Sequence, residues 1–434
     1  MNTSALLTDR YELTMVDAAL RSGQADRRCV FEVFARSLPG RRRYAVVAGL
    51  GRLLDDLSRF RFDQDSLAYL AESRVIDDRT RDWLAEFRFG GSIDAYAEGE
   101  VYFPGSPVLT VEGGFAECVV LETIVLSILN HDSAVATAAA RMIGAACGRP
   151  CIEMGSRRTH EIAAVAAARA AYIAGFATTS NLAAGQRWGI PTAGTAAHAF
   201  TMVHDDERTA FQAQVDALGR GTTLLVDTYD VIQGIRTAIE VAGPTLGAIR
   251  LDSGDLPTQA RMARTLLDEL GAGQTRIVVT GDLDEYAIAG LASAPIDGYG
   301  VGTSLVTGSG NPTAGFVYKL VARRRDDGEW TPVEKRSLGK ATHGGRKYAA
   351  RQLDNGIAVA ELVKTLPMAG GRHGRPLQCA AVRDGEAVAD VRLSAARERC
   401  AASIAELPEH AMKLSPGEPA IDTLMEEARQ WSRR

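Results

Sequence analysis

Short apolar runs that end at acidic or glycine residues recur between about residues 190 and 310, and they constrain the fold more than any other feature of the sequence. Four such runs are clear, and helical patterns alternate with them: 224–229, 248–255, 277–282 and 296–303. They recur about every 20 to 30 residues, which is the length of one strand-and-helix unit in a parallel sheet. The pattern therefore predicts a parallel sheet whose strands carry polar residues and glycines at their carboxyl ends.

An α/β barrel with its chemistry at the carboxyl ends of the strands explains this rhythm best. An open doubly wound sheet is the alternative, because periodicity does not separate the two. Residues 1–115 mix short helix-like and strand-like segments, and strand patterns without a helical rhythm resume after Lys319. We therefore predict an irregular α/β barrel domain over residues 116–320, which carries the phosphate-binding site, beside an α+β domain that residues 1–115 and 321–434 build together.

Charge and cysteine usage narrow the class of protein. The formal net charge of -5 does not indicate the basic surface that binds a polyanion, so nucleic acid is not an expected partner. The first thirty residues carry several acids and no signal-peptide pattern, and the longest apolar run, 121–129, is too short to cross a bilayer. The 6 cysteines form no CxxC pair, which indicates reduced thiols. We expect a cytoplasmic protein that binds no membrane.

Lysine is absent from most of the chain. The first lysine is Lys319, and every earlier basic side chain is arginine or histidine. A Schiff-base mechanism needs a lysine amine, so such chemistry is excluded within residues 1–318.

A phosphate ligand is suggested by the last of the apolar runs, which ends in Gly300-Val-Gly302-Thr303. Glycines at the end of a strand let backbone N–H groups approach a phosphate, and a threonine adds a hydroxyl donor. The spacing is not that of the dinucleotide fingerprint, because Leu305 stands where its third glycine would be. A tight turn without a ligand is the alternative interpretation.

Three carboxylates follow the predicted strands: Asp252, Asp255 and Asp282. They suit a ribose diol or the Mg²⁺ that accompanies a pyrophosphate, although a single acid there is more often a helix N-cap. Which of them would bind Mg²⁺ is left open. Their repetition favours a shared site.

Fixed positive charge and one histidine complete the candidate set. Arg157 and Arg250 carry guanidinium groups that bind carboxylate or phosphate through two hydrogen bonds. His198 lies among small residues, and histidine acts as an acid, a base or a phosphate-accepting nucleophile near neutral pH. A structural histidine is the more common case for a lone imidazole among alanines. We nevertheless select His198 as the candidate catalytic residue.

Five ordered segments together resemble the nicotinate phosphoribosyltransferase family, which belongs to the type II phosphoribosyltransferases. They are Leu7-Thr-Asp-Arg-Tyr11-Glu-Leu-Thr-Met, Gly175-Phe176-Ala-Thr-Thr-Ser180-Asn181, Gly194-Thr195-Ala-Ala-His198, Arg250-Leu-Asp-Ser-Gly-Asp255 and Gly300-Val-Gly302-Thr303. The resemblance extends from Leu6 to about Arg351. A further segment, 335–347, departs from the family pattern at His343-Gly344, and no role is assigned to it.

The resemblance implies the reaction and its partners. Nicotinate and phosphoribosyl pyrophosphate would give nicotinate mononucleotide and pyrophosphate in NAD salvage, with Mg²⁺ as cofactor. ATP would be hydrolysed through a phosphohistidine, so the enzyme would be classed as an ATP-coupled ligase. The family assembles as a head-to-tail homodimer with shared active sites.

The resemblance also implies the residue roles. His198 would be phosphorylated by ATP, and Arg157 would take the nicotinate carboxylate. Tyr11, supplied by the neighbouring subunit, and Phe176 would sandwich the pyridine ring. The remaining substrate-binding residues would be Gly194, Thr195, Arg250, Asp252, Asp255, Asp282, Gly300, Gly302 and Thr303.

Three other functions share parts of this pattern. Nicotinamide could be the acceptor, although Arg157 favours the acid. A metal-dependent lyase or isomerase barrel that acts on a sugar phosphate would use the same glycines and strand-end acids. A non-catalytic nucleotide sensor is disfavoured by His198.

Overall fold

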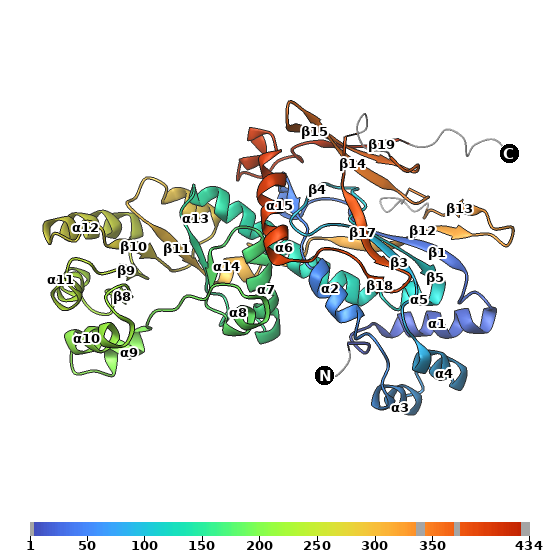
Figure 1. Ribbon diagram of the computed structural model, residues 1–434, viewed down its shortest axis with the longest axis horizontal. Coiled ribbons are helices and arrows are strands. Elements are labelled where there is room, and N and C mark those ends of the chain that lie inside the picture. Colours follow the sequence, from blue (N-terminus) through green and yellow to red (C-terminus); the bar gives the residue numbers. More distant parts are fainter. Residues whose placement is uncertain (1–3, 336–342, 369–373, 427–434) are drawn as a thin grey trace. The chain divides into compact units, whose positions relative to one another are not determined.

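The computed structural model describes residues 4–335, 343–368 and 374–426 (Figure 1). The chain forms two compact units, one built from residues 1–134 and 313–434 and the other from residues 135–312. The first unit is thus made from both ends of the chain and the second from its middle. The sequence predicts a division at 115/116 and 320/321, whereas the first boundary in the structure falls inside the continuous helix α6 (Glu122–Ala146). Segment 335–347, to which no role was assigned, lies mostly outside the described residues.

The first unit contains an antiparallel seven-stranded sheet in the order β13-β12-β1-β5-β3-β17-β18. Its strands are β1 (Arg28–Ala35), β3 (Ser92–Tyr96), β5 (Leu109–Gly114), β12 (Phe316–Arg324), β13 (Trp330–Pro332), β17 (Gln378–Arg383) and β18 (Glu386–Ala387). The pairing of β1 with β12 joins residues that are almost 300 positions apart, such as Cys29 with Arg323. Both ends of the chain are therefore needed to build this sheet.

Two smaller sheets belong to the same unit. The four-stranded sheet has the order β16 (Arg375–Pro376), β14 (Tyr348–Asp354), β15 (Ile357–Lys364) and β19 (Asp422–Glu426), and β2 (Ala45–Val46) pairs with β4 (Val101–Tyr102). Asn355 and Gly356 connect β14 to β15 with φ of 48° and 83°. Asn-Gly is the residue pair that a tight hairpin turn with positive φ at both positions favours.

Helices and short 3-10 turns complete the first unit: α1 (Arg10–Ser22), α2 (Leu50–Leu57), α3 (Gln64–Glu72), α4 (Asp78–Glu86), α5 (Phe115–Val119), α15 (Leu393–Ala405), η1 (Pro39–Arg41) and η2 (Glu409–Met412). The segment Phe115–Ala146 is long and apolar enough to cross a membrane by length and composition alone. However, 67% of its most apolar window is buried inside the structure. Within it, the buried carboxylate of Asp132 pairs with Arg52 at 2.8 Å. These observations favour a core helix.

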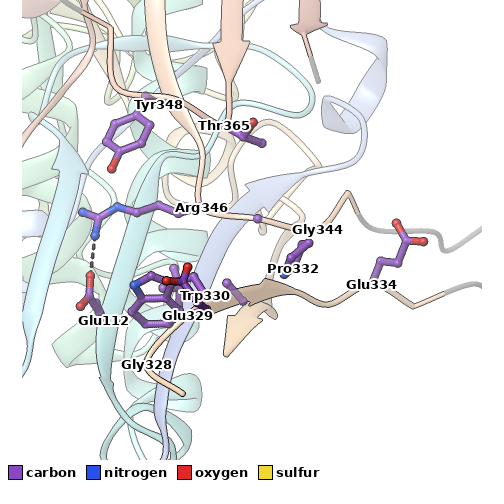
Figure 2. Close-up of a pocket in the computed structure, with 13 residues that line it drawn as sticks. Glu112, Gly328, Glu329, Trp330, Pro332, Glu334, Gly344, Arg346, Tyr348 and Thr365 are labelled. Carbon is purple, nitrogen blue, oxygen red and sulfur yellow. Dashed lines mark hydrogen bonds and ion pairs between the residues drawn. The ribbon is translucent and has the colours of Figure 1, made fainter. Parts of the chain in front are cut away.

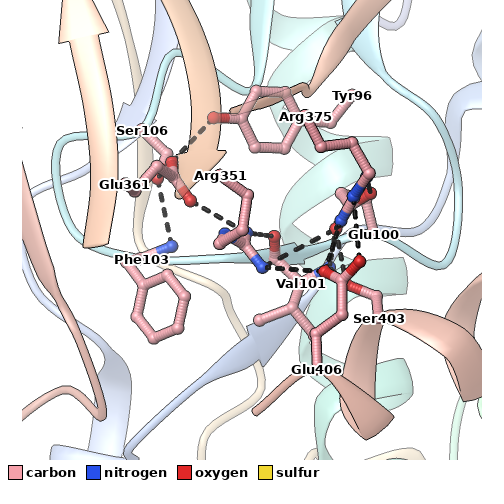
Figure 3. A network of polar contacts seen from close by, with 10 residues as sticks. All are labelled: Tyr96, Glu100, Val101, Phe103, Ser106, Arg351, Glu361, Arg375, Ser403 and Glu406. Carbon is pink, nitrogen blue, oxygen red and sulfur yellow. Dashed lines mark hydrogen bonds and ion pairs between the residues drawn. The ribbon is translucent and has the colours of Figure 1, made fainter. Parts of the chain in front are cut away.

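A buried network of charged side chains joins β14 and β15 to the rest of the first unit (Figure 3). Arg351 and Glu361 are both completely buried, and the Nη2 of Arg351 lies 2.9 Å from the Oε2 of Glu361. Glu361 also accepts a hydrogen bond of 2.7 Å from the hydroxyl of Tyr96. The other charged or hydroxyl members of the network are Glu100, Ser106, Arg375, Ser403 and Glu406. A buried ion pair needs such additional hydrogen bonds to offset its desolvation.

The second unit contains a parallel six-stranded sheet in the order β7-β6-β11-β10-β9-β8. Its strands are β6 (Cys151–Glu153), β7 (Thr178–Thr179), β8 (Thr223–Leu225), β9 (Ala248–Leu251), β10 (Arg276–Val279) and β11 (Gly298–Val301). The sheet is curled into a half-barrel with β7 and β8 at its two edges. This arrangement, with the additional unit, confirms the predicted α/β class.

The helices of the second unit alternate with these strands: α7 (Glu161–Ile173), α8 (Leu182–Trp188), α9 (His198–Met202), α10 (Glu207–Leu218), α11 (Val231–Ala242), α12 (Leu256–Glu269), α13 (Glu285–Gly290) and α14 (Thr303–Val306). Asp206, Asp230 and Asp284 cap α10, α11 and α13 by accepting backbone N–H groups of the first turn. Because every strand of the sheet runs in the same direction, the loops that enter these helices lie together at the carboxyl ends of the strands.

Candidate active site at the carboxyl edge of the parallel sheet

The loops that leave the carboxyl ends of β6, β8, β9, β10 and β11 form the candidate active site. The strands are short and largely buried, and a polar residue or glycine stands within two residues of the end of each: Gly155, Asp227, Asp252, Thr280 and Gly302. In α/β proteins ligands bind outside the carboxyl ends of parallel strands. Five of the residues selected from the sequence lie on these loops, namely Arg157, Asp252, Asp255, Asp282 and Gly302, and Gly194, Thr195 and His198 lie on the segment between α8 and the first turn of α9.

His198 is the first residue of α9, and its side chain is 36% exposed. The Nδ1 atom lies 3.1 Å from the Oγ1 of Thr228, just beyond β8. The Nε2 atom lies 3.8 Å from the Oδ2 of Asp252, just beyond β9. The latter distance is too long for a hydrogen bond, so His198 and Asp252 lie close together without bonding directly. The imidazole is therefore partly open to solvent and lies near the residues that follow β8 and β9.

Asp227 connects the ends of β8 and β9 and was not among the residues selected from the sequence. Its Oδ2 atom accepts hydrogen bonds of 2.8 Å from the backbone N–H of Asp252 and from the hydroxyl of Ser253. Its Oδ1 atom is buried and has no hydrogen-bond partner among the described residues. The strand-end position of Asp227 could be read from the sequence, but its bond to the next loop could not.

A hydrogen bond joins Arg250 to Thr195, three residues before His198 in the chain. The Nη1 atom of Arg250 donates to the Oγ1 of Thr195 at 2.6 Å and to the carbonyl of Ala196 at 3.1 Å. Burial lowers the pKa of Arg250, the charges of Asp252 and Asp227 oppose that effect, and the positive charge of Arg157 adds to it. The two selected arginines therefore act on the same region. Gly194 is exposed, and a Cβ atom there would meet open space.

The carboxylates selected from the sequence differ in their surroundings. Asp252 is half-buried and accepts a hydrogen bond from the hydroxyl of Thr280, at the end of β10. Asp255 stands at the N-cap position of α12, but its side chain makes no capping hydrogen bond. Asp282 is exposed, and the cap of α13 is Asp284 instead. Neither Asp255 nor Asp282 thus serves as the N-cap that the alternative interpretation expects.

The selected glycines bring neighbouring loops together. A Cβ atom at Gly300 would lie 2.5 Å from the Cγ2 of Thr280 and 2.7 Å from the Sδ of Met154. A Cβ atom at Gly302 would lie 3.3 Å from the carbonyl of Met154. Close packing against β6 and β10 therefore explains Gly300 without any ligand. Thr303 is exposed at the first position of α14.

Arg157 is exposed on the loop between β6 and α7, whereas Phe176 is only 1% exposed. Phe176 lies between α7 and β7, and its backbone N–H donates to the carbonyl of Ala171 at 3.1 Å. The ring of Phe176 does not present a face to solvent, so its stacking on a substrate stays a prediction that requires the ring to be uncovered. Met154 is half-buried just after β6 and lies next to Gly300 and Gly302.

Tyr11 belongs to the first unit, where it lies on α1 and is 46% exposed. Burial, the negative charges of Glu122 and Glu12, and a hydrogen bond with Glu122 raise the pKa of Tyr11 well above its usual value. The hydroxyl is therefore protonated at neutral pH. The exposed ring is available for a contact outside its own unit.

A hollow of about 580 Å³ lies elsewhere, in the first unit (Figure 2). Its walls include Trp330, Tyr348 and Arg346. The guanidinium of Arg346 pairs with Glu112 and Asp94, so the positive charge of this side chain is already compensated within the protein. None of the residues selected from the sequence lines this hollow, and we do not assign the active site to it.

Comparisons with known proteins agree with one another. The model of the nicotinate phosphoribosyltransferase N-terminal domain matches residues 6–130. The chain is 60% identical over 432 residues to nicotinate phosphoribosyltransferase pncB1 of Mycobacterium tuberculosis, covering 97% of this chain and 95% of the relative. It is 39% identical over 358 residues to nicotinate phosphoribosyltransferase of Bacillus subtilis, covering 80% of this chain and 73% of the relative.

Solved structures give the same result. The structure of human nicotinic acid phosphoribosyltransferase matches with a TM-score of 0.82 and 26% identity, covering 96% of this chain and 97% of the human chain. The structure of nicotinate-nucleotide pyrophosphorylase from Pyrococcus furiosus matches with a TM-score of 0.74 and 26% identity, covering 92% of this chain and 94% of that chain. The similarity therefore includes both units.

Proposed function

The chain belongs to the nicotinate phosphoribosyltransferase family, and we propose that it couples phosphoribosyl transfer to ATP hydrolysis through a phosphohistidine at His198. The transfer joins the pyridine nitrogen of nicotinate to C1 of the ribose and breaks the bond between C1 and the pyrophosphate oxygen. Nicotinate mononucleotide and pyrophosphate are the products, and the reaction belongs to NAD salvage.

The placement of His198 is the observation that carries the ATP-coupled part of the proposal. Its Nδ1 atom lies beside the Thr228 hydroxyl, which leaves Nε2 toward the solvent-facing edge next to Asp252. Asp252 and Asp227 lie on the two loops that follow β9 and β8, and the backbone N–H of Asp252 donates to the carboxylate of Asp227. A histidine held by a hydrogen bond at one nitrogen presents the other nitrogen as a nucleophile.

In the proposed phosphoryl transfer, the γ-phosphoryl group of ATP passes first to His198 and then to water. The Nε2 lone pair attacks the γ-phosphorus of ATP, the Nε2–P bond forms, and the bond from that phosphorus to the oxygen of ADP breaks. Water later cleaves the Nε2–P bond, and inorganic phosphate leaves. ATP hydrolysis thus changes the active site between its phosphorylated and unphosphorylated forms. Ribosyl transfer itself depends on positioning of the pyridine nitrogen and on stabilisation of the leaving pyrophosphate.

Positive charge and hydroxyl donors explain the choice of anionic substrates. Arg157 would bind the nicotinate carboxylate, and Arg250 with Thr303 would bind phosphoribosyl pyrophosphate, helped by Thr195 and by the backbone of Gly302. Nicotinate would be preferred over nicotinamide because only nicotinate has a carboxylate for Arg157 to bind. Arg157 is exposed, and the charge of Arg250 adds to the positive potential around it.

Mg²⁺ fits the carboxylates at this edge. No group of three or more possible metal ligands occurs within residues 4–335, 343–368 and 374–426, but Mg²⁺ that accompanies a pyrophosphate needs only one or two protein carboxylates. The unpaired Oδ1 atom of Asp227 and the half-buried Asp252 are the residues that would hold it. Bound Mg²⁺ would supply neutralisation of the pyrophosphate charge. Asp255 and Asp282 would contact the ribose.

The homodimer with shared active sites, the contribution of Tyr11 from the neighbouring subunit and a cytoplasmic location are parts of the same proposal. The exposed side chain of Tyr11 supports its contribution from a neighbouring subunit. Gly194, Gly300 and Phe176 would shape the pocket rather than bind through polar atoms.

The proposal is tested by measuring pyrophosphate release with and without ATP in wild type and in His198→Ala. We expect ATP to accelerate wild type and to leave the variant unchanged at a slow basal rate, because the histidine energises the site without performing ribosyl transfer. His204→Ala is the matched control, since His204 lies on the segment after α9 and bonds to the carbonyl of Phe200. Equal acceleration of His198→Ala by ATP would refute the proposal.

A further inference from the structure

A second buried acid of the parallel sheet, Glu153, has no role in the function described so far. It is the last residue of β6 and is completely buried. β6 lies between β7 and β11, and Glu153 is in register with Thr179 on one side and Val301 on the other. It therefore stands where three strands end side by side.

The carboxylate of Glu153 binds both of the loops that leave β6 and β7. Its Oε1 atom accepts the backbone N–H of Gly155, and its Oε2 atom accepts the hydroxyl of Thr179. The backbone carbonyl of Glu153 also accepts the N–H of Ser180 at 2.8 Å. One residue thus fixes the first turn of the Arg157 loop against the neighbouring strand.

Further hydrogen bonds close a ring around this carboxylate. The Oγ1 atom of Thr179 accepts the backbone N–H of Asn181 at 2.9 Å. The side-chain amide of Asn181 in turn donates to the hydroxyl of Ser156 at 3.0 Å, on the Arg157 loop. The two loops are therefore linked twice, through Glu153 below and through Asn181 above.

The surroundings of Gly155 show that the bond from Glu153 determines the position of the turn that carries Arg157. A Cβ atom at Gly155 would lie 2.2 Å from the Cγ1 of Val306 and 3.2 Å from the carbonyl of Gly302. The N–H of Arg158 donates to the carbonyl of Gly155 at 2.8 Å and closes a turn around Arg157. The turn that presents Arg157 is thus packed against the glycine loop after β11.

The contacts of Glu153 differ from those of the buried acids that pair with a cation. The hydrogen bonds to its carboxylate come from a backbone N–H and a hydroxyl, whereas the buried Glu285 pairs with Arg141 and the buried Asp132 with Arg52. Burial of a carboxylate without a cation is costly. An acid kept in such a place contributes more to the geometry of its donors than to stability.

We propose that Glu153 is a positioning residue that holds the Arg157 loop in the conformation that binds the carboxylate of nicotinate. This rests on the proposed role of Arg157. Glu153 does not touch the substrate, so its loss acts through the loop. A displacement of about 1 Å in a binding group can cost on the order of 100-fold in rate or affinity.

Two measurements on Glu153→Ala test the proposal. Hydrogen exchange followed by mass spectrometry should show faster exchange of the amides around Gly155 and Ser180. The KM for nicotinate should rise about tenfold or more, while the KM for phosphoribosyl pyrophosphate changes by less than about threefold. Glu153→Gln should recover most of both effects, because its amide oxygen still accepts the N–H of Gly155.

Asp297→Ala is the matched control for a lost carboxylate. Asp297 accepts the N–H of Ile277 at 2.7 Å, at the amino end of the same sheet and away from the candidate site. We expect this variant to lose stability and to keep both KM values. If Glu153→Ala does not fold, Thr179→Val removes the donor to Oε2 together with the acceptor of the Asn181 N–H, keeps the bond from Gly155 to Oε1, and should give a smaller change of the same kind.

The outcomes separate this proposal from the proposed function. An unchanged nicotinate KM in folded Glu153→Ala, or an equal rise in Asp297→Ala, would overturn the positioning role. Faster exchange near Gly155 without a change in nicotinate KM would also overturn it if Arg157→Ala does raise that KM. If Arg157→Ala leaves the nicotinate KM unchanged, the role proposed for Arg157 fails first, and hydrogen exchange alone then decides whether Glu153 orders the loop.

Discussion

Replacing Arg157 by alanine gives a sharp test of how the site recognises nicotinate. Arg157 is exposed on its loop, so its removal should leave the fold intact. Its charge also acts on the half-buried Arg250. The change therefore removes one of two positive groups without emptying a core position.

The expected magnitude follows from the interaction that is lost. A hydrogen bond to a charged group contributes about 1.5–3 kcal/mol, and each 1.4 kcal/mol corresponds to about a tenfold change in affinity. Because the side chain is exposed, solvent screens part of the interaction, and we take the lower end of the range. We expect the KM for nicotinate to rise about 10- to 30-fold.

Steady-state kinetics with pyrophosphate release as the readout measures this effect. The KM for phosphoribosyl pyrophosphate should change by less than about threefold. The preference for nicotinate over nicotinamide should fall by about the same factor as nicotinate affinity, since nicotinamide has no carboxylate to lose. Arg157→Lys should be intermediate, because lysine keeps the charge and loses the planar pair of donors. An equal rise in both KM values would refute the reasoning.

Three further changes test the structure. Arg351→Met should lower the free energy of unfolding by about 3–5 kcal/mol in urea titrations, because it leaves the buried Glu361 without its cation; a loss below about 1 kcal/mol would contradict this. Burial and two nearby carboxylates raise the pKa of Glu207 to about 7, so wild type should lose stability as pH rises from about 4.5 to 7. Glu207→Gln should be more stable than wild type at pH 8, by on the order of 2 kcal/mol, and equal to it near pH 4.5; equal stability at both pH values would show that the carboxylate is not penalised. Gly155→Ala should cost about 1–3 kcal/mol because its Cβ would overlap Val306; unchanged unfolding would show that the loop relaxes freely.

The strand-end rhythm of the sequence predicts much of the second unit correctly. Strands β8, β9, β10 and β11 fall on the four apolar runs, and Asp252, Gly300 and Arg250 lie at or next to their carboxyl ends. Local sequence suffices here because a parallel sheet repeats one unit, and each unit carries its own strand, turn and helix.

Other features depend on contacts that local sequence does not contain. β6 and β7 have only three and two residues, too few for a periodic pattern, so Glu153 gave no signal. The family segment around Phe176 did not indicate that its ring is buried. The pairing of β1 with β12 joins the two ends of the chain, and only the three-dimensional structure reveals such a partner.

Labelling with γ-³²P-ATP tests the central claim most directly, because it asks whether His198 accepts a phosphoryl group. Wild type and His204→Ala should each take up an acid-labile, alkali-stable label that mass spectrometry maps to His198. His198→Ala should take up none. Labelling of His198→Ala to the same extent as wild type, or a label mapped to another residue, would contradict the account.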